Sequence, residues 1–378
     1  MALELDTNDA SRYIWKCWHV LGLHPTNKYR NLYWCYAGFI FLAAVWHPFH
    51  LLLQMFFIGD FIRVINNLSI SLTLLCATAK HVIMFYFTRV NLQKARTYFR
   101  KLDEHAKTNV SERDMLNAEV RFCHRLYYCY IVTYLLPLIA YSVLGYYQHS
   151  LLFEGWFPFD WTANEGAYYL AYGSQVFGTS ITFMQNLTCD TCPIIYLLIA
   201  LAHLRVIKSR MSRMGNVMFK SNEERYEELA FCVSVYEDWM QLFLSVRPVV
   251  SVVMGTQFTV TAFVACFSAV TFMDSQRSLL QVTVSTTYLM CILVEVLPCC
   301  WCVNELIAET RKLTSALYSC NWYQQNTKFR RALIIFMTRS QQEVNILAGN
   351  IVPVTLQTFI SMVKFSFSMY TLLNEIRE

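Results

Sequence analysis

The chain has 378 residues, of which 56% are hydrophobic, 16% aromatic and 15% charged, and its formal net charge is +5. Soluble domains carry about 25% charged residues, so this chain has too little polar surface for a soluble globule. Apolar runs of roughly 20 residues, long enough to cross a bilayer, recur from Tyr33 to the C-terminus. The composition therefore predicts an all-α protein that crosses a membrane several times.

The first segment, residues 1–32, has no uninterrupted apolar run followed by a small-residue cleavage site, because Arg12, Lys16 and His19 interrupt it. We therefore expect no signal peptide. The alternation of apolar and charged residues around Trp15 instead predicts a cytoplasmic amphipathic lead-in helix that lies on the membrane surface.

Seven spans are expected along the rest of the chain, so the two termini lie on opposite sides of the membrane. Of the 31 Lys and Arg residues, 26 fall in segments on the side of the N-terminus. The positive-inside rule then places the N-terminus in the cytoplasm and the C-terminus outside, which is the inverse of a G-protein-coupled receptor. The spans are expected at 33–58, 64–88, 126–147, 166–203, 248–273, 279–303 and 347–373.

The loops differ in length and composition. The outer loop 147–167 is rich in aromatic residues, including Trp156 and Phe159. It could cap an outer cavity, or it could belong to an interfacial aromatic belt. The inner segments 204–247 and 304–346 are long, and their apolar residues recur at helical spacing. We expect these segments to extend the helices into the cytoplasm, where residues 304–346 form an anchor.

None of the 14 cysteines falls in the outer loops 147–167 or 274–278, so we expect free thiols. The spacings Cys189-Asp-Thr-Cys192 and Cys299-Cys-Trp-Cys302 resemble metal ligands. Neither has a His or Cys partner pair at finger spacing, so small apolar packing residues are favoured over a metal site. The chain also carries no P-loop, dinucleotide fingerprint, His-Glu-x-x-His or Gly-x-Ser-x-Gly motif, and we predict no enzyme and no cofactor.

Four ionisable residues fall at membrane depth: Lys80, Asp190, Glu295 and Lys364. Each would cost about 2.5 to 3.5 kcal/mol at a helix centre, so such groups usually face protein or water. Lys80 can reach the interface through its long side chain, and Glu295 is close to the inner boundary. Lys364 is central in a last span that has many hydroxyl and amide groups. Residues 347–378 are therefore expected to face a wet lumen, as in a channel or carrier, although no internal repeat of the transporter kind is found.

The C-terminal 60 residues resemble a known family. They look like the signature of insect odorant receptors, and the modest second inner loop resembles an odour-tuning subunit rather than the longer co-receptor of that family. The matching pieces are Ala316-Leu-Tyr-Ser-Cys-Asn-Trp322, Arg331-Ala-Leu333, Met337, Arg339-Ser-Gln341, Ala348-Gly349, Leu356, Phe359 and Phe367-Ser-Met-Tyr370-Thr-Leu-Leu373.

This resemblance implies a ligand-gated, non-selective cation channel in the plasma membrane of sensory-neuron dendrites. The subunit would join the olfactory co-receptor in a heterotetramer and bind a small volatile organic ligand in the outer half of residues 33–303. The seventh helices would line the pore, with membrane lipid outside and no nucleic acid as partner.

The pocket of the family draws on the second, third, fourth and sixth spans. In the third span, Ser142, Gly145 and His149 form one helical stripe in the outer half. Each candidate could instead be ordinary interhelical packing. The remaining candidates are chosen by their depth in the membrane and by the helix face on which they lie. They are Ile70, Thr73, Leu74, Phe177, Ile181, Met184 and Tyr288.

The pore and assembly candidates come from the last span and from the inner helices. Phe367, Tyr370, Thr371 and Asn374 share one helix face, so four copies could form a gate at Phe367. Alternatively, Phe367 and Tyr370 pack against the fifth and sixth spans. Further pore candidates are Lys364 and Glu375, and the assembly candidates are Trp239, Tyr318 and Trp322.

Two rival functions remain open. A gustatory-type receptor channel of the same superfamily would be expected to end in Thr-Tyr, three hydrophobic residues and Gln-Phe, whereas this chain has Tyr370-Thr-Leu-Leu-Asn374. A metabotropic seven-helix receptor would be expected to carry an outer disulfide, Asp-Arg-Tyr and Asn-Pro-x-x-Tyr, none of which is present.

Overall fold

The computed structural model describes residues 5–23, 30–214, 221–272, 279–342 and 344–377. The described chain is almost entirely helical, and its strands are one short pair. The elements are η1 (Thr7–Ser11), α1 (Arg12–Val20), α2 (Arg30–Gln54), α3 (Phe61–Ala106), α4 (Val110–Tyr147), α5 (Glu165–Arg213), α6 (Asn222–Phe272), α7 (Leu279–Tyr318), η3 (Trp322–Gln324), α8 (Thr327–Ser340), β1 (Leu347–Ala348), β2 (Val352–Pro353) and α9 (Leu356–Arg377).

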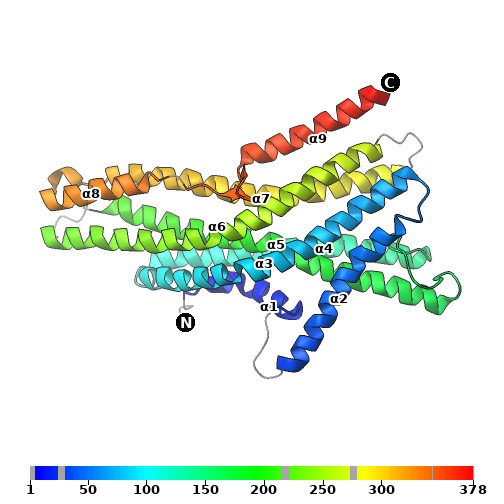
Figure 1. The fold of residues 1–378 in the computed structure, drawn as a ribbon. Helices are drawn as coiled ribbons and strands as arrows, with labels where there is room; N and C mark the ends of the chain where they lie inside the picture. The colour runs from blue at the N-terminus through cyan, green and yellow to red at the C-terminus, as the bar shows by residue number, and fades with distance from the viewer. Residues whose placement is uncertain (1–4, 24–29, 215–220, 273–278, 343, 378) are drawn as a thin grey trace.

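The helices form one elongated bundle, in which the α3–α4 and α7–α8 connections lie at one end and the α2–α3 and α4–α5 connections at the other (Figure 1). The longest helices run through most of the bundle without interruption. The 49 residues of α5 reach about 74 Å at 1.5 Å per residue, more than twice the ~30 Å hydrocarbon core of a bilayer. The bundle is therefore long enough for one part to lie in a membrane while the rest projects beyond it, as the inner segments predict.

Five helices in the described part of the chain, α2 to α6, are long and apolar enough to cross a membrane. They contain the spans expected at 33–58, 64–88, 126–147, 166–203 and 248–273, except for a few terminal residues. The sixth expected span lies in α7. Asparagine side chains start three of the helices: Asn109, Asn164 and Asn326 each accept a hydrogen bond from a backbone N–H in the first turn.

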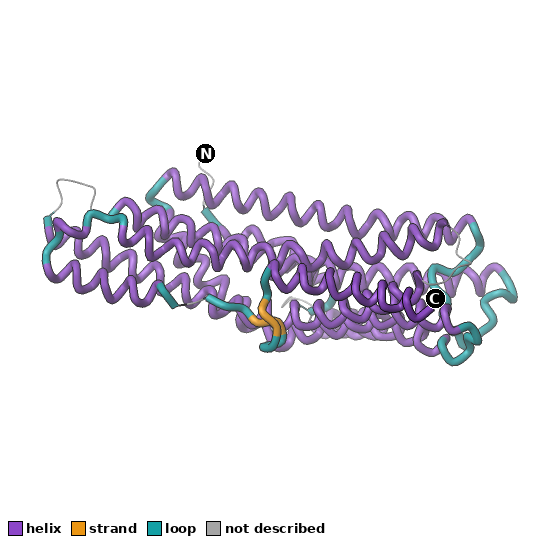
Figure 2. The backbone as a smooth tube through the Cα atoms, turned by 90° about the horizontal axis from the view of Figure 1, so that it is seen from above, coloured by secondary structure: helices purple, strands orange, loops and turns teal. Residues whose placement is uncertain are grey.

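The core is centred on α5, which contacts α2, α3, α4, α6 and α7. Figure 2 shows the long helices running side by side along the bundle. The α5 residues from Leu187 to Leu204 are all buried, because helices cover α5 on every side. Trp239 of α6 is fully buried against it, and its indole N–H donates to the carbonyl of Ala200 at 2.8 Å. A helix that is apolar all round its surface is expected in such a central position.

We expected the N-terminal helix to rest its apolar face on a membrane surface. In the structure, that face is covered by protein instead. Ile14 and Trp18 of α1 are buried in the main core of the chain, and α1 contacts α5. An amphipathic pattern shows that one face is covered, but it does not distinguish protein from lipid as the cover.

A buried polar junction fixes η1 to the bundle. The Asp103 carboxylate accepts hydrogen bonds from the Thr7 backbone N–H at 2.9 Å and from the Thr7 hydroxyl at 3.0 Å. Its other oxygen lies 3.5 Å from Nε2 of His203 on α5. Burial raises the pKa of Asp103 to about 7, although the two Thr7 hydrogen bonds oppose this shift.

The last helix begins later than expected. We expected a span from Leu347, but residues 347–353 form a two-stranded antiparallel hairpin, and α9 begins at Leu356. The turn contains Gly349 and Asn350, whose positive φ angles of 56° and 61° interrupt a helix. The hairpin packs on α6, because the Gly349 N–H donates to the carbonyl of Ser251 at 2.8 Å.

Candidate functional site

The predicted ligand stripe on α4 faces two tyrosines of α5. The Tyr172 hydroxyl donates to the carbonyl of Ser142, and the Tyr168 hydroxyl donates to the carbonyl of Gly145 at 3.2 Å. A Cβ atom on Gly145 would lie 3.2 Å from the Tyr172 ring. The exposed His149 ring is centred 5.5 Å from that of Tyr168. The stripe therefore holds α4 close to α5 in this structure.

The candidates on α5 face a different neighbour, α2. The Phe177 ring is centred 5.9 Å from that of Phe39, and Ile181 is buried in a small cluster with Ile40. Met184 packs against the same cluster. The structure thus divides these six residues of α4 and α5 between two interfaces rather than around one space.

The α3 candidates lie within the bundle. Leu74 is buried, Ile70 and Thr73 are half-buried, and the Thr73 hydroxyl donates to the carbonyl of Ser69 in its own helix at 2.9 Å. The side chain of Tyr288 lies outside the described part of the chain.

The aromatic outer loop folds down onto the ends of α2, α3 and α5. The Gln175 side chain accepts from the Phe153 N–H at 3.2 Å and donates to the Phe153 carbonyl at 2.9 Å. The amide of the buried Asn67 donates to the carbonyls of Leu51 and Glu154, both at 3.1 Å. Sequence reasoning identified the aromatic residues of this loop but not the two amides that fasten it.

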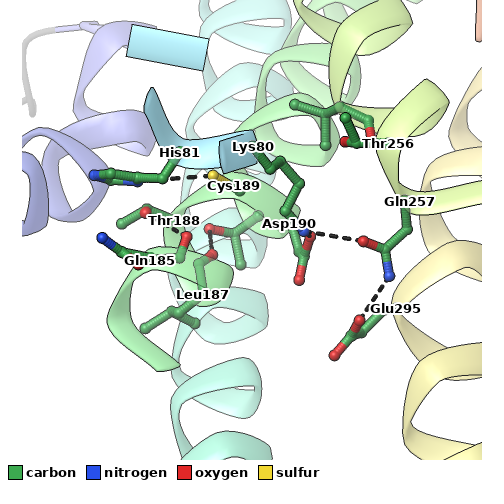
Figure 3. A network of polar contacts seen from close by, with 12 residues as sticks. Lys80, His81, Gln185, Leu187, Thr188, Cys189, Asp190, Thr256, Gln257 and Glu295 are labelled. Atoms are coloured by element: carbon green, nitrogen blue, oxygen red, sulfur yellow. Dashed lines mark hydrogen bonds and ion pairs between the residues drawn. The ribbon is translucent and has the colours of Figure 1, made fainter. Parts of the chain in front are cut away.

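A ring of polar side chains lies in the middle of the bundle, with one member from each of α3, α4, α5, α6 and α7. Figure 3 shows four of its members, Lys80, Asp190, Gln257 and Glu295. The Lys80 ammonium donates to Asp190 Oδ1 at 2.6 Å and to Gln257 Oε1 at 2.9 Å. Gln257 Nε2 donates to Glu295 Oε2 at 2.7 Å. The Tyr134 hydroxyl oxygen lies 2.7 Å from Asp190 Oδ2 and 2.9 Å from Glu295 Oε1, which closes the ring.

The ring corrects our interpretation of Lys80. From the sequence, that side chain could reach the membrane interface, but in the structure it is 3% exposed and is paired with Asp190. A buried ammonium that has a carboxylate partner at 2.6 Å has no need of water. Sequence reasoning missed Tyr134 and Gln257, because neither type is unusual in a membrane helix.

The pore candidates lie on α9, which leaves the hairpin at an angle to the bundle and contacts α6 and α7 (Figure 1). Lys364, Phe367 and Thr371 are exposed, and Phe367 is 67% exposed. The structure therefore does not pack Phe367 against α6 or α7. The side chains of Tyr370, Asn374 and Glu375 lie outside the described residues.

The three assembly candidates have different surroundings. Trp239 stabilises the chain itself, because it is buried between α6 and α5. Tyr318 is 62% exposed at the inner end of α7, and the half-buried Trp322 has its ring centred 5.8 Å from that of Tyr318. Of the three, Trp239 is thus the fully buried one, whereas Trp322 packs against the edge of the main core and Tyr318 is largely exposed.

Among the described residues, no group of three or more His, Cys, Asp or Glu side chains gathers in a way that could hold a metal ion. Cys189, Cys192, Cys299, Cys300 and Cys302 are buried free thiols. They pack in the main core as small apolar residues.

Comparisons with known proteins agree with this architecture. The family described as "7tm Odorant receptor" matches residues 60–367. Odorant receptor 2a of Drosophila melanogaster is 28% identical, over 98% of this chain and 97% of that receptor. Odorant receptor 33b of the same fly is 27% identical, over 98% of each chain.

The fold also matches a solved structure, the insect olfactory receptor OR5 from Machilis hrabei. The TM-score is 0.79 at 14% identity, over 98% of this chain and all of the other. A second structure of that receptor, in complex with eugenol, gives the same TM-score at 15% identity. The match confirms the predicted all-α, seven-helix membrane fold, and the receptor relatives confirm the prediction that the chain is not an enzyme. The chain belongs to the insect odorant receptor family.

Proposed function

We propose that this chain is the odour-binding subunit of a ligand-gated, non-selective cation channel that assembles with the olfactory co-receptor. The observation that carries the proposal is the exposure of α9. Its side chains Lys364, Phe367 and Thr371 are exposed on the described chain. A charged group at this depth is favourable when it faces water rather than lipid. Copies of α9 around a central axis would provide that water-filled space.

The proposed ligand is a small volatile organic molecule, bound in the outer half of the bundle. The olfactory receptor of similar fold from Machilis hrabei has been solved with eugenol, which supports this ligand class. The candidate residues are mostly apolar or aromatic with a few hydrogen-bond donors, as small-molecule pockets usually are. Because they lie at the α4–α5 and α2–α5 interfaces, binding would separate or reorient these helices.

The experiment that tests the proposal is expression of this chain in oocytes or cultured cells, with and without the olfactory co-receptor. A panel of volatile compounds is applied while current is recorded. We expect odour-evoked cation current with an odour ranking specific to this chain when both subunits are present. Odour responses that vanish when a G-protein pathway is blocked, with no co-receptor requirement, would contradict the proposal.

The proposed pore face can be tested with two aromatic residues of the same helix. Phe365 and Phe367 are both exposed, at 50% and 67%, but two residues along a helix place them on nearly opposite faces. We expect Phe367→Ala to raise basal current or shift ion permeability while the odour ranking is retained. Phe365→Ala should conduct like the parent. Identical behaviour of the two variants would show that the Phe367 face does not line the pore.

A further inference from the structure

The buried ring of Lys80, Tyr134, Asp190, Gln257 and Glu295 has a hydrogen-bond balance that requires an additional proton. An ammonium group can only donate, so the oxygens of Asp190 and Gln257 accept from Lys80. Because Gln257 Oε1 accepts, its Nε2 is left to donate, and it does so to Glu295 at 2.7 Å. These contacts fix the orientation of the Gln257 amide.

The closing contacts involve Tyr134, whose hydroxyl has a single proton. Its oxygen lies within hydrogen-bond distance of both carboxyl groups, at 2.7 Å from Asp190 and 2.9 Å from Glu295. A proton shared between two acceptors makes two weaker, bent bonds, whereas both of these distances are those of full hydrogen bonds. One of the carboxyl groups must therefore carry a proton and donate it to the tyrosine oxygen.

Position and charge indicate which carboxyl group that is. Asp190 is 4% exposed and lies 2.6 Å from the Lys80 ammonium, so an ionised Asp190 has its counter-charge beside it. Glu295 is half-buried, and its second oxygen accepts from the neutral amide of Gln257. With the proton on Glu295, the ring has one positive and one negative charge and is neutral overall. A neutral ring is favoured in an apolar interior.

We propose that Glu295 is a proton-binding site in the resting receptor, and that its proton completes a closed, neutral ring that fastens α3, α4, α5, α6 and α7 together. This assignment goes beyond odour binding and conduction and does not depend on them. Within α6, Gln257 lies two residues after Gly255, against which the hairpin before α9 packs. The ring therefore also fixes the part of α6 that holds the inner end of α9.

The assignment is tested by making the same chemical change at each carboxyl group. In Glu295→Gln the new amide can donate to the Tyr134 oxygen and accept from Gln257, so every contact of the ring is kept. In Asp190→Asn the Lys80 ammonium loses its counter-charge. We expect the thermal unfolding midpoint of detergent-solubilised receptor to be unchanged by Glu295→Gln and clearly lowered by Asp190→Asn. A midpoint lowered by Glu295→Gln and unchanged by Asp190→Asn would place the proton on Asp190 and overturn the proposal. Equal midpoints for the two variants would also overturn it.

A spectroscopic measurement identifies the proton directly and requires neither odorant nor current. Asp103, whose pKa is about 7, would also be partly protonated at neutral pH, so the spectra are recorded in an Asp103→Asn background. We expect the infrared spectrum of the parent of this series to contain the carbonyl stretching band of a buried protonated carboxyl group, and Glu295→Gln to remove it. A parent spectrum without this band, or a band that survives Glu295→Gln, would contradict the assignment. Because these readouts report the ring alone, their failure is distinct from failure of the channel proposal.

Tyrosines one helical turn apart on α4 provide a further control. The Tyr130 hydroxyl is buried and has no hydrogen-bond partner among the described residues, whereas Tyr134 contacts both carboxyl groups. Tyr134→Phe should lower the unfolding midpoint, and Tyr130→Phe should leave it unchanged. Equal midpoints for the two variants would show that the ring does not stabilise the receptor.

Discussion

Single side chains hold this bundle together at three levels. Gln175 and Asn67 fasten the outer loop, the ring around Lys80 and Asp190 joins the middle, and Asp103 fixes the N-terminal segment. Apolar packing alone gives little direction to helices in lipid, because lipid tails are as apolar as leucine. An interhelical hydrogen bond in a membrane contributes about 0.6 to 2 kcal/mol, but it specifies one register.

The Asp103 junction predicts a pH dependence of stability. The pKa of Asp103 is raised to about 7 in the folded chain, against about 3.9 when unfolded, so its stabilising contribution is largest at low pH. That contribution decreases as pH rises through 7, by about 1.4 kcal/mol between pH 6 and pH 8. Asp103→Asn cannot ionise and can still accept from Thr7, so it should lose this dependence. The unfolding midpoint of solubilised receptor at pH 6 and pH 8 measures the effect.

The control for this prediction is Asp114→Asn, which changes an exposed aspartate on α4. It should retain the pH dependence of the parent. If Asp103→Asn and the parent have the same pH dependence, Asp103 is not the group that titrates.

At the scale of residues, part of the candidate site could be predicted from the sequence. The sequence identifies Lys80, Asp190 and Glu295 as unusual, because ionisable residues are rare in apolar helices. It does not show their pairing, since Lys80 and Asp190 are 110 residues apart and are joined by the packing of α3 on α5. Lys364, which the sequence favours most, is the exposed one.

At the scale of elements, helix type and approximate position follow from the sequence, whereas ends depend on backbone details. Apolar runs with few charges predict α2 to α6 well. The expected start of the last span at Leu347 is wrong, because apolar content continues through a turn that requires positive φ at Gly349 and Asn350. Hydropathy does not distinguish a hairpin packed on a helix from the first turns of the next helix.

The contact between this hairpin and α6 predicts the effect of a small substitution. A Cβ atom on Gly255 would lie 2.8 Å from the backbone nitrogen of Gly349, closer than van der Waals contact allows. Gly255→Ala should therefore displace the hairpin and impair gating, which is measured as a reduced odour-evoked current at normal surface level. Gly38→Ala on α2 is the matched control, because nothing lies within 4 Å of its added methyl group. It should be neutral or slightly stabilising, since alanine favours helix by about 1 kcal/mol over glycine.

A normal current from Gly255→Ala would show that the hairpin does not need this close contact. A loss of current from Gly38→Ala as well would show that the effect is not specific to the hairpin.

At the scale of the whole molecule, the fold is one elongated bundle of long helices (Figure 1). The seven-helix count and the long inner extensions were predictable from hydropathy and from charge, because a bilayer limits helices to few arrangements. The central position of α5 was less predictable. Its periodicity is weak because it is apolar on all sides, and such a helix gives no indication of which neighbour lies on which face.

The proposed orientation predicts where tags will be accessible. Of the 31 Lys and Arg residues, 26 fall in the four segments 1–31, 88–125, 204–247 and 304–339, which are expected on the inner side. A tag placed before Met1 should stain after permeabilisation, and a tag placed after Glu378 should stain on intact cells. Reversed staining would invalidate the inverted topology and the channel proposal with it.

The hairpin fixes one end of α9 and leaves the other to move. Gly349 lies in the hairpin just before α9 and touches α6. The helix α9 has 22 residues and is about 33 Å long. Any tilt of α9 therefore pivots at that contact, and displacement grows with distance from it. A tilt of about 5° carries the far end sideways by about 3 Å and Phe367, halfway along, by about half as much. A modest change at the hairpin is therefore expected to displace the far end of α9 more than any other part of the helix.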